Sequence, residues 1–283
     1  MSEFLAFFVP WEFSWLVQIS VWGALLLYFN GLRNTPAGEL PGYWPIIGFV
    51  VGVVLMYLVT QTRYDYWSQY MFFVHRIQHL VLHHMAPFLI ALAWPAPVLA
   101  RGIPGPVRAW FSRRRWLRWI YVALYRVLQQ PAVASILFVG LIAFWLMPEL
   151  HFDAMLSRNR YWVMNWSMAL DGLLFWWLML ERGGRGITPR LGYGTRMLLL
   201  AAVMVPQIII GASITFAETN VFDVYAVCGR AWPLYPMTDQ HIGGLVTWIP
   251  AAMMSVVAAL VVLRFWVHDD ARQYAAGAEA APA

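Results

Sequence analysis

Four histidines lie within ten residues of a single apolar stretch: His75, His79, His83 and His84. Imidazole nitrogens bind transition metals and haem iron, and the thioether of Met71, four residues before His75, is a soft donor that suits Cu(I). Residues four apart share one face of a helix, whereas His84 points almost directly away from His75. We therefore predict a metal-ligand stripe of Met71, His75 and His79, and a separate, structural role for His83 and His84.

The same stretch also allows a purely structural explanation. Histidines inside a helix bundle can be hydrogen-bonded across helices without any metal. Pro87 lacks an N–H, so it should free the carbonyl of His83, kink the helix and create a polar pocket near His83 and His84. Asp171, midway along a later apolar run, is expected to pair with His84 or Arg76, and the alternative is a place on a proton path.

Further side chains with ligand chemistry follow near the ends of later apolar runs. Depth alone places His151 and His241 in the same layer as the first two histidines of the stretch. Asp239, just before His241, is a candidate ligand as well as a candidate cap for the last helix. The residues that could complete a metal site are His151, His241, Met71, Met147, Met237 and Asp239.

The chain has a single cysteine, Cys228, which excludes an internal disulfide and any CxxC motif. A lone thiol can bind metal transiently or fill a gap among apolar side chains. We favour the role of apolar filler for Cys228.

Composition assigns the chain to a membrane. Hydrophobic residues make up 61% and charged residues 12% of the sequence, whereas a soluble protein has about a quarter charged residues. We predict an all-α, polytopic membrane helix bundle of about seven transmembrane helices in one domain over 1–270, followed by a disordered tail over 271–283. The expected spans are 13–30, 44–61, 69–93, 132–148, 161–181, 196–217 and 241–266.

The arginines predict the orientation of this bundle. All 19 basic residues are arginine, and 14 of them fall on one side, chiefly in the segments 94–131 and 182–196. The positive-inside rule makes that side cytoplasmic, with the N-terminus outside and the C-terminus in the cytoplasm. The net charge of +5 therefore indicates membrane topology, and no nucleic-acid partner is expected. The start of the chain lacks a basic n-region, so no removable signal peptide is expected.

An amphipathic cytoplasmic segment is predicted near 106–130. Its centre, residues 113–121, alternates arginines with Trp116, Trp119 and Tyr121. Such a helix lies on a membrane with its arginines at anionic headgroups and its aromatic rings at the interface. We interpret it as a topology anchor, and the alternative is a docking site for a cytoplasmic partner.

Several short motifs follow one another along the chain: His75-Arg-Ile-Gln78-His79 with Ala86-Pro87, Trp145-Leu-Met-Pro148, Gly172-Leu-Leu-Phe-Trp176-Trp177, and Asp239-Gln240-His241-Ile-Gly243-Gly244 with Trp248 and Pro250. In these motifs, over about residues 60–265, the chain resembles the multi-spanning cytochrome c oxidase assembly factor CtaG family. The resemblance implies a role in making active haem–copper oxidase, at a copper-insertion step. It also implies that His75 and His79 occupy the family's paired-histidine positions, and Asp239 and Gln240 its acidic motif.

Two positions depart from the family pattern. The family often has Trp-His-x-Pro where this chain has Leu146 and Met147 between Trp145 and Pro148, and Glu-His where it has Met164-Asn165. Methionine at both places keeps a soft donor that copper accepts, whereas a haem ligand or a hard-metal site would be less well served.

We therefore expect a non-enzymatic assembly factor in the bacterial plasma membrane that helps to metallate the core subunit of a haem–copper oxidase from the outer leaflet. Its expected cofactor is Cu(I), held by His75 and His79, and its expected partners are oxidase subunits, the lipid bilayer and a copper-donor protein. The alternatives are a haem-bearing or quinone-linked electron-transfer protein, an ion or metal transporter, and a structural accessory subunit of a respiratory complex. The nucleotide-binding patterns G-x-G-x-x-G and G-K-[ST] are absent from the sequence.

Overall fold

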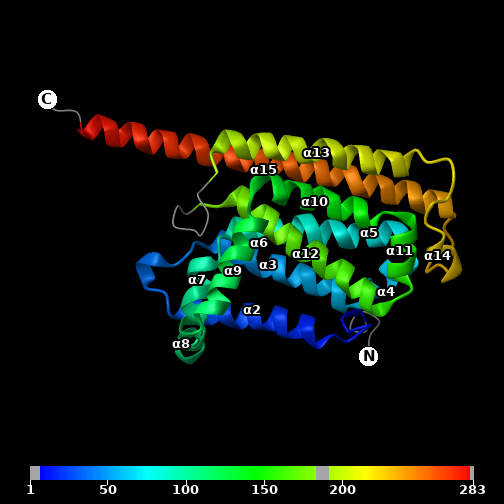
Figure 1. The fold of residues 1–283 in the computed structure, drawn as a ribbon, viewed down its shortest axis with the longest axis horizontal. Helices are drawn as coiled ribbons and strands as arrows, with labels where there is room; N and C mark the ends of the chain where they lie inside the picture. Colours follow the sequence, from blue (N-terminus) through cyan, green and yellow to red (C-terminus); the bar gives the residue numbers. More distant parts are fainter. Residues whose placement is uncertain (1–6, 183–190, 281–283) are drawn as a thin grey trace.

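The long apolar runs of the sequence fold as helices, because only a helix pairs its backbone N–H and C=O groups within one segment when water is absent. The computed structural model describes residues 7–182 and 191–280, and it is 82% helix with no strand in those ranges. The long helices run side by side along the longest axis of the molecule (Figure 1). The all-α prediction is confirmed.

Five of the described helices are each long and apolar enough to cross a membrane. They are α2 (Trp15–Arg33), α3 (Tyr43–Gln61), α12 (Arg158–Leu180), α13 (Tyr193–Thr215) and α15 (Pro236–Ala280). Two bent pairs raise the number to seven if each pair is one span. This range of five to seven candidate spans agrees with the predicted bundle of about seven.

The first bent pair contains the histidine stretch. α5 (Phe72–Leu80), η2 (Val81–Met85) and α6 (Ala86–Ala93) form one continuous rod, which meets α7 (Ala96–Gly102) at 76°. The bend lies at Trp94, whose φ of 51° is in the left-handed region, just before Pro95. The kink that we predicted at Pro87 is therefore displaced to Trp94, and the chain accommodates Pro87 by a π-helical turn, η2.

The second bent pair joins α9 (Arg115–Leu128) to α10 (Pro131–Trp145) at 75°. No residue of α8 or α9 is buried, and Trp116, Trp119 and Tyr121 are all exposed. The predicted amphipathic segment is thus helical, and α9 lies at a steep angle to the span α10 that follows it. Its contact with a membrane surface stays a prediction. The remaining short helices are η1 (Ala37–Glu39), α4 (Arg63–Tyr70), α8 (Gly105–Arg113), α11 (Pro148–Met155) and α14 (Val224–Val227).

The bundle has two distinct ends (Figure 1). We call the end formed by α4, α11 and α14 the α4 end, and the opposite end, towards which α7 and α8 lie, the α8 end. The last helix, α15, runs the length of the bundle and continues as helix to Ala280 beyond the α8 end. The disordered tail predicted over 271–283 stays a prediction, and 281–283 lie outside the described residues.

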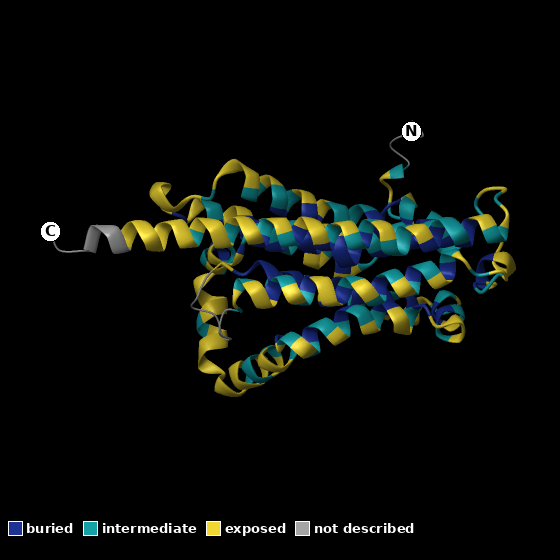
Figure 2. Ribbon diagram, turned by 90° about the horizontal axis from the view of Figure 1, so that it is seen from above, coloured by how far each residue is buried: buried dark blue, intermediate teal, exposed yellow. Residues whose placement is uncertain are grey.

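The rod of α5, η2 and α6 is the central element, because it packs against α3, α12 and α15. Beside η2 and α6, the rings of Phe138 and Phe175 stack at 3.8 Å between centroids and join Phe88 and Trp176 in the largest apolar cluster. Exposed residues lie on the outer faces of the long helices, and buried residues lie on the faces turned towards the interior of the bundle (Figure 2). The polar side chains of the rod are thereby enclosed by protein.

Candidate functional site: a buried histidine layer

The predicted histidine pair of α5 forms the centre of the site. The Nε2 atoms of His75 and His79 lie 3.0 Å apart, and both side chains are buried. His79 also contacts Arg76 Nη2 through Nδ1 at 2.9 Å and the carboxamide oxygen of Asn165, on α12, through Nε2 at 3.1 Å. The helical spacing of the two histidines therefore places both rings on one face, as expected.

These contacts determine where the protons of the neutral rings lie. A guanidinium can only donate, so His79 Nδ1 accepts from Arg76 and the ring proton of neutral His79 is on Nε2. That Nε2–H donates towards Asn165 Oδ1 and His75 Nε2. His75 Nε2 must therefore be unprotonated and act as the acceptor. The proton of His75 is then on Nδ1, a buried atom without a hydrogen-bond partner in the described part of the chain.

His151, on α11, joins the same layer, as its depth predicted. Its ring centroid lies 5.3 Å from that of His75, and the side chain is fully buried. Nε2 contacts the hydroxyl of Tyr225 at 2.9 Å, and Nδ1 donates to the carbonyl of Trp145 at 3.0 Å. Burial, and then the nearby charge of Arg76, lower the pKa of His151 to about 3, so it is neutral at ordinary pH.

A second set of buried polar groups is centred on Asp65 of α4, next to the histidine pair. This set was not predicted from the sequence. Asp65 accepts hydrogen bonds from Tyr161 Oη at 2.7 Å, from Gln78 Nε2 at 2.9 Å and from Gln69 Nε2 at 3.0 Å. Burial raises the pKa of Asp65 to about 7, which these hydrogen bonds partly oppose. The sequence feature that could have predicted this set is Gln78, a polar residue between His75 and His79 in an otherwise apolar segment.

Asp239, in the acidic motif of the last helix, binds the start of α5. Asp239 Oδ2 and Oδ1 accept the backbone N–H groups of Phe72 and Phe73 at 3.0 and 2.8 Å, and its carboxylate also pairs with Arg230. Asp239 thus caps α5, whose own preceding residue, Met71, supplies no side-chain cap. The expectation that Asp239 caps its own helix is wrong, because α15 begins three residues earlier at Pro236.

The two residues after Asp239 hydrogen-bond to the backbone of residues 217–221, in the segment between α13 and α14. Gln240 accepts from the N–H of Val221 at 2.7 Å and donates to the carbonyl of Thr219 at 3.0 Å. His241 directs Nε2 to the carbonyl of Ala217 at 3.2 Å. A Cβ atom at Gly243 would lie 2.3 Å from the ring of Phe72, so only glycine lets α15 approach α5 this closely.

The structure brings His75, His79 and His151 together, and it distributes the other predicted ligands elsewhere. His241 is engaged at Ala217, and Asp239 at the start of α5. Met71 is buried immediately before α5, Met237 is half-buried on the first turn of α15, and Met147 is exposed. Cys228 is exposed, so its predicted role as an apolar filler is wrong.

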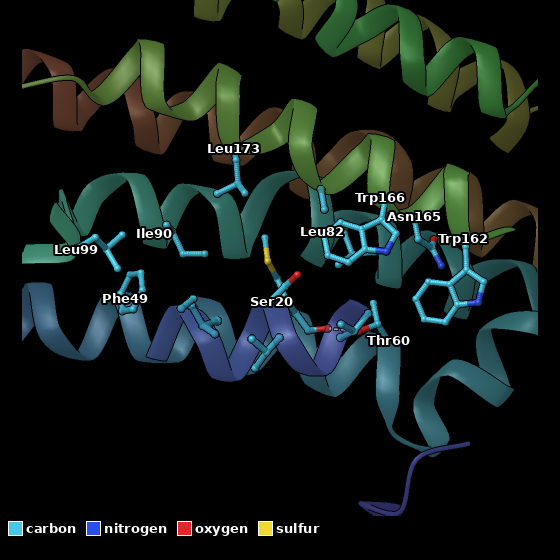
Figure 3. A pocket seen from close by; sticks show the side chains of 16 residues that line it. Ser20, Phe49, Thr60, Leu82, Ile90, Leu99, Trp162, Asn165, Trp166 and Leu173 are labelled. Atoms are coloured by element: carbon cyan, nitrogen blue, oxygen red, sulfur yellow. Dashed lines mark hydrogen bonds between the residues drawn. The ribbon is translucent and has the colours of Figure 1, made fainter. Parts of the chain in front are cut away.

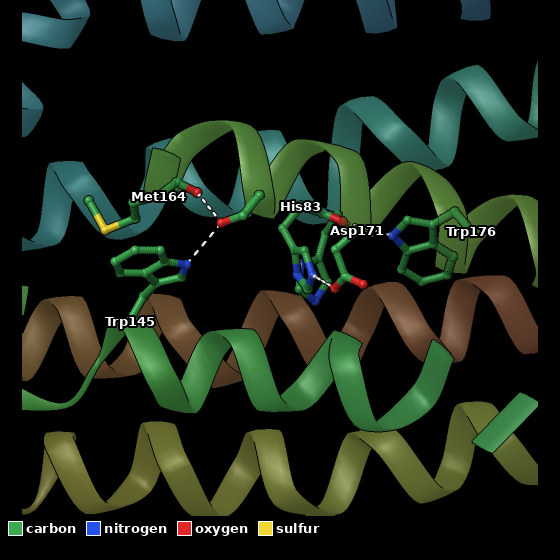
Figure 4. A network of polar contacts seen from close by, with 7 residues as sticks. His83, Trp145, Met164, Asp171 and Trp176 are labelled. Atoms are coloured by element: carbon green, nitrogen blue, oxygen red, sulfur yellow. Dashed lines mark hydrogen bonds and ion pairs between the residues drawn. The ribbon is translucent and has the colours of Figure 1, made fainter. Parts of the chain in front are cut away.

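The deeper pair, His83 and His84, lies on the π-helical turn η2. The two Nδ1 atoms are 3.2 Å apart, and His83 Nε2 contacts the Asp171 carboxylate at 3.1 Å (Figure 4). Asp171 therefore pairs with His83, and our expectation of His84 or Arg76 is wrong. The π-helical turn adds a residue to the helical turn, so a wheel drawn for a regular α-helix misplaced this side chain.

The carbonyl that Pro87 frees is the anchor of this region, as predicted. Trp176 Nε1 donates to the oxygen of His83 at 3.0 Å (Figure 4). A Cβ at Gly172 would lie 2.4 Å from the same oxygen, so glycine is required for α12 to reach η2. The motif from Gly172 to Trp176 thus packs α12 against the π-helical turn η2 and supplies a hydrogen-bond donor to its free carbonyl.

Two cavities border the histidine layer. A small one of about 20 Å³, room for one water molecule, lies between the pairs and is lined by Arg76, His79, His83 and His84. A larger one of about 260 Å³, almost entirely apolar, lies between α2, α3, α6 and α12 (Figure 3). Asn165 lines the larger cavity and bonds His79, so it separates apolar space from the polar layer.

The donor set can be tested against a metal. No group of three or more His, Cys, Asp or Glu side chains that could hold an ion occurs within 7–182 and 191–280. The 3.0 Å between His75 and His79 lets both nitrogens lie about 2.0 Å from one ion, but it leaves no space for a haem between the rings. A histidine that ligates through Nε2 carries its proton on Nδ1, where Arg76 now donates. The layer fits one small ion only if Arg76 leaves His79.

The fold and this layer define a class: a multi-pass helical membrane protein with buried polar side chains at the centre of its bundle. The model of the cytochrome c oxidase caa3 assembly factor family (Caa3_CtaG) matches residues 26–269, and the chain belongs to this family. The family match confirms the resemblance drawn from the motifs.

The chain is also similar to longer mycobacterial proteins. It is 26% identical over 284 residues to an uncharacterized protein of Mycobacterium leprae, covering 94% of this chain and 41% of the relative. It is 27% identical over 243 residues to uncharacterized proteins of Mycobacterium bovis and Mycobacterium tuberculosis, covering 81% of this chain and 35% of each relative. The chain thus spans about two fifths of the length of these relatives or less. No solved structure matches it.

Proposed function

We propose that this protein is a non-enzymatic assembly factor that matures the core subunit of a haem–copper oxidase in the bacterial plasma membrane. The observation that carries the proposal is the buried layer of His75, His79 and His151 inside a bundle of this family. Polar side chains are costly inside a membrane bundle and are usually functional there. The arginine-rich α8 end faces the cytoplasm, and the α4 end, with the layer, faces outward.

The copper part of the proposal concerns His75 and His79. The Nε2 atoms of these side chains lie 3.0 Å apart, and the ring of His151 is adjacent. Imidazoles are good ligands for copper. Copper would come from a donor protein on the outer side and pass to the oxidase subunit.

A Cu(I) competition titration tests this site. The double variant His75→Ala, His79→Ala should lower the Cu(I) affinity of the purified protein at least about a hundredfold, because loss of outer-shell partners alone changes metal affinity by about 10- to 100-fold. The control is His268→Ala, an exposed histidine near the end of α15. An affinity equal to the wild type in the double variant would refute copper binding at this pair.

Arg76 should oppose copper binding, and Arg76→Gln should therefore strengthen it. Two positive charges about 5 Å apart repel each other by about 3 kcal/mol at an effective dielectric constant of about 20. In addition, the glutamine oxygen can accept the proton that a metal-bound His79 carries on Nδ1. We expect an increase in Cu(I) affinity of at least about tenfold in the same titration. A weaker affinity would show that Arg76 assists the site instead.

The assembly role is tested in cells. Membranes lacking this protein should contain oxidase with reduced activity and reduced copper, and the wild-type chain should restore both. If the histidine double variant restores them equally well, the layer is structural and the copper proposal fails while the assembly role stands. Normal oxidase activity and copper content without the protein would refute the assembly role itself.

A further inference from the structure

A second site lies at the α8 end, far from the histidine layer. A cleft of about 880 Å³ opens between α3, α6 and α15. One part of its lining is apolar and includes Ile47, Val51 and Leu92. The basic part of the lining, which we call the rim, carries Arg182, Arg264, His268 and Arg272.

Among the described residues, the lining of this cleft holds three arginines and one acid, Asp269. Neither Arg182, Arg264 nor Arg272 forms an ion pair in the part of the chain that the structure describes. Asp269, the acid in the cleft wall, accepts a hydrogen bond from the hydroxyl of Tyr193. The sequence 183–190, Gly-Gly-Arg-Gly-Ile-Thr-Pro-Arg, contains no acid either.

Arg182 and Arg264 both line this cleft. The guanidinium carbon of Arg182 lies 4.6 Å from the ring centroid of Phe265, the residue after Arg264. Burial, and then the charge of Arg264, lower the pKa of Arg182. Two arginines that form no ion pair among the described residues, at one partly apolar cleft, indicate that an anion from outside the chain binds there.

Aromatic side chains place the cleft at the level of lipid headgroups. Tyr43 and Trp44, at the start of α3, are among the most exposed aromatic residues of the chain. The rings of Tyr193 and Trp266 stack at 6.1 Å on the other side. Tyrosine and tryptophan gather at the interface between a bilayer and water, where phosphate groups lie.

We propose that this cleft binds one anionic glycerophospholipid, with its phosphate between Arg182 and Arg264 and an acyl chain along α3 and α6. Free phosphate offers the same charge, but it leaves the apolar wall uncovered. The wall contains Gly48, where an added Cβ would be in ordinary contact with the carbonyl oxygen of Leu89 at 3.6 Å and with Ala93 Cβ at 3.9 Å. The proposal is independent of the oxidase role.

Native mass spectrometry of the purified full chain provides the test. The protein is equilibrated with vesicles of phosphatidylcholine containing one fifth phosphatidylglycerol and extracted in mild detergent, and its retained lipids are counted. We expect the ratio of phosphatidylglycerol to phosphatidylcholine among the retained lipids to exceed the ratio in the vesicles at least about tenfold, the order expected when two arginines meet one phosphate. Arg182→Gln with Arg264→Gln should abolish the enrichment. The control, Arg33→Gln with Arg63→Gln, removes the same charge from exposed positions of α2 and α4 outside the cleft and should retain it.

A groove-filling variant separates the lipid from free phosphate. Gly48→Phe keeps both arginines but occupies the apolar wall, so it should also lose phosphatidylglycerol. Inorganic phosphate added during equilibration should not displace the lipid from the wild type. Enrichment that persists in the double arginine variant, or in folded Gly48→Phe protein, overturns the proposal. Displacement by phosphate alone overturns it in favour of a plain anion site.

Discussion

Replacing Asp239 by alanine should destabilise the protein by about 3–5 kcal/mol, the cost of removing one partner of a buried, hydrogen-bonded ion pair. The side chain is almost fully buried, and its carboxylate accepts two backbone N–H groups at the start of α5 besides pairing with Arg230. Alanine would leave Phe72 N and Phe73 N without partners in the protein. Because α5 carries the histidine pair, the layer should loosen as well.

Unfolding by sodium dodecyl sulfate in mixed micelles, followed by circular dichroism, measures this loss. Asp239→Asn should be intermediate, since one oxygen can still accept one N–H. Asp223→Ala is the matched control, because the Asp223 side chain is exposed and, among the described residues, accepts a hydrogen bond only from Asn220. It should change stability by less than about 0.5 kcal/mol. An Asp239→Ala protein as stable as the Asp223→Ala protein would contradict the capping role.

The part of the loss that comes from the ion pair can be separated. In an Arg230→Gln background, Asp239→Ala should cost less, because only the two capping hydrogen bonds remain to be lost. If the cost is the same in both backgrounds, Arg230 contributes nothing to the stability of the cap.

Replacing Gly172 by alanine should cost about 1–3 kcal/mol, the usual penalty for overpacking. The new methyl group would lie 2.4 Å from the carbonyl oxygen of His83 and 2.9 Å from its Cα. Both atoms belong to the backbone, so α12 must move away from η2. That movement lengthens the hydrogen bond from Trp176 to the same oxygen and the contact of Asp171 with His83.

The same unfolding assay detects this effect, and Gly140 on α10 offers a control. A Cβ at Gly140 meets nothing within 4 Å, so Gly140→Ala should be neutral or stabilising by up to about 1 kcal/mol. Trp176→Phe should reproduce part of the Gly172→Ala loss, about 1–3 kcal/mol, because it leaves the His83 carbonyl buried without its donor. Equal stabilities of the two alanine variants would contradict the close approach of α12 and η2.

Much of the fold follows from local properties of the sequence. Apolar runs bounded by proline, glycine and charge determine where helices form, since a bilayer allows few other structures. The spacing of His75 and His79 determined their common face, and the missing N–H of Pro87 determined that the His83 carbonyl would need another donor. These are consequences of helix geometry within one segment.

The partners of the buried polar groups were decided by the tertiary structure alone. Asp65, Tyr161 and Gln78 come from three helices, and nothing in their spacing shows that they meet. The extra residue of η2 turned His83 towards Asp171, a register that a regular α-helix does not have. Likewise, Asp239 caps a helix that begins 167 residues earlier in the chain, because α15 packs against α5 there. The sequence by itself determined which segments are helices and which face of α5 holds its histidines. Only the packing of those helices decided what each buried donor and acceptor binds, since hydrogen-bond partners across a bundle depend on where distant segments meet.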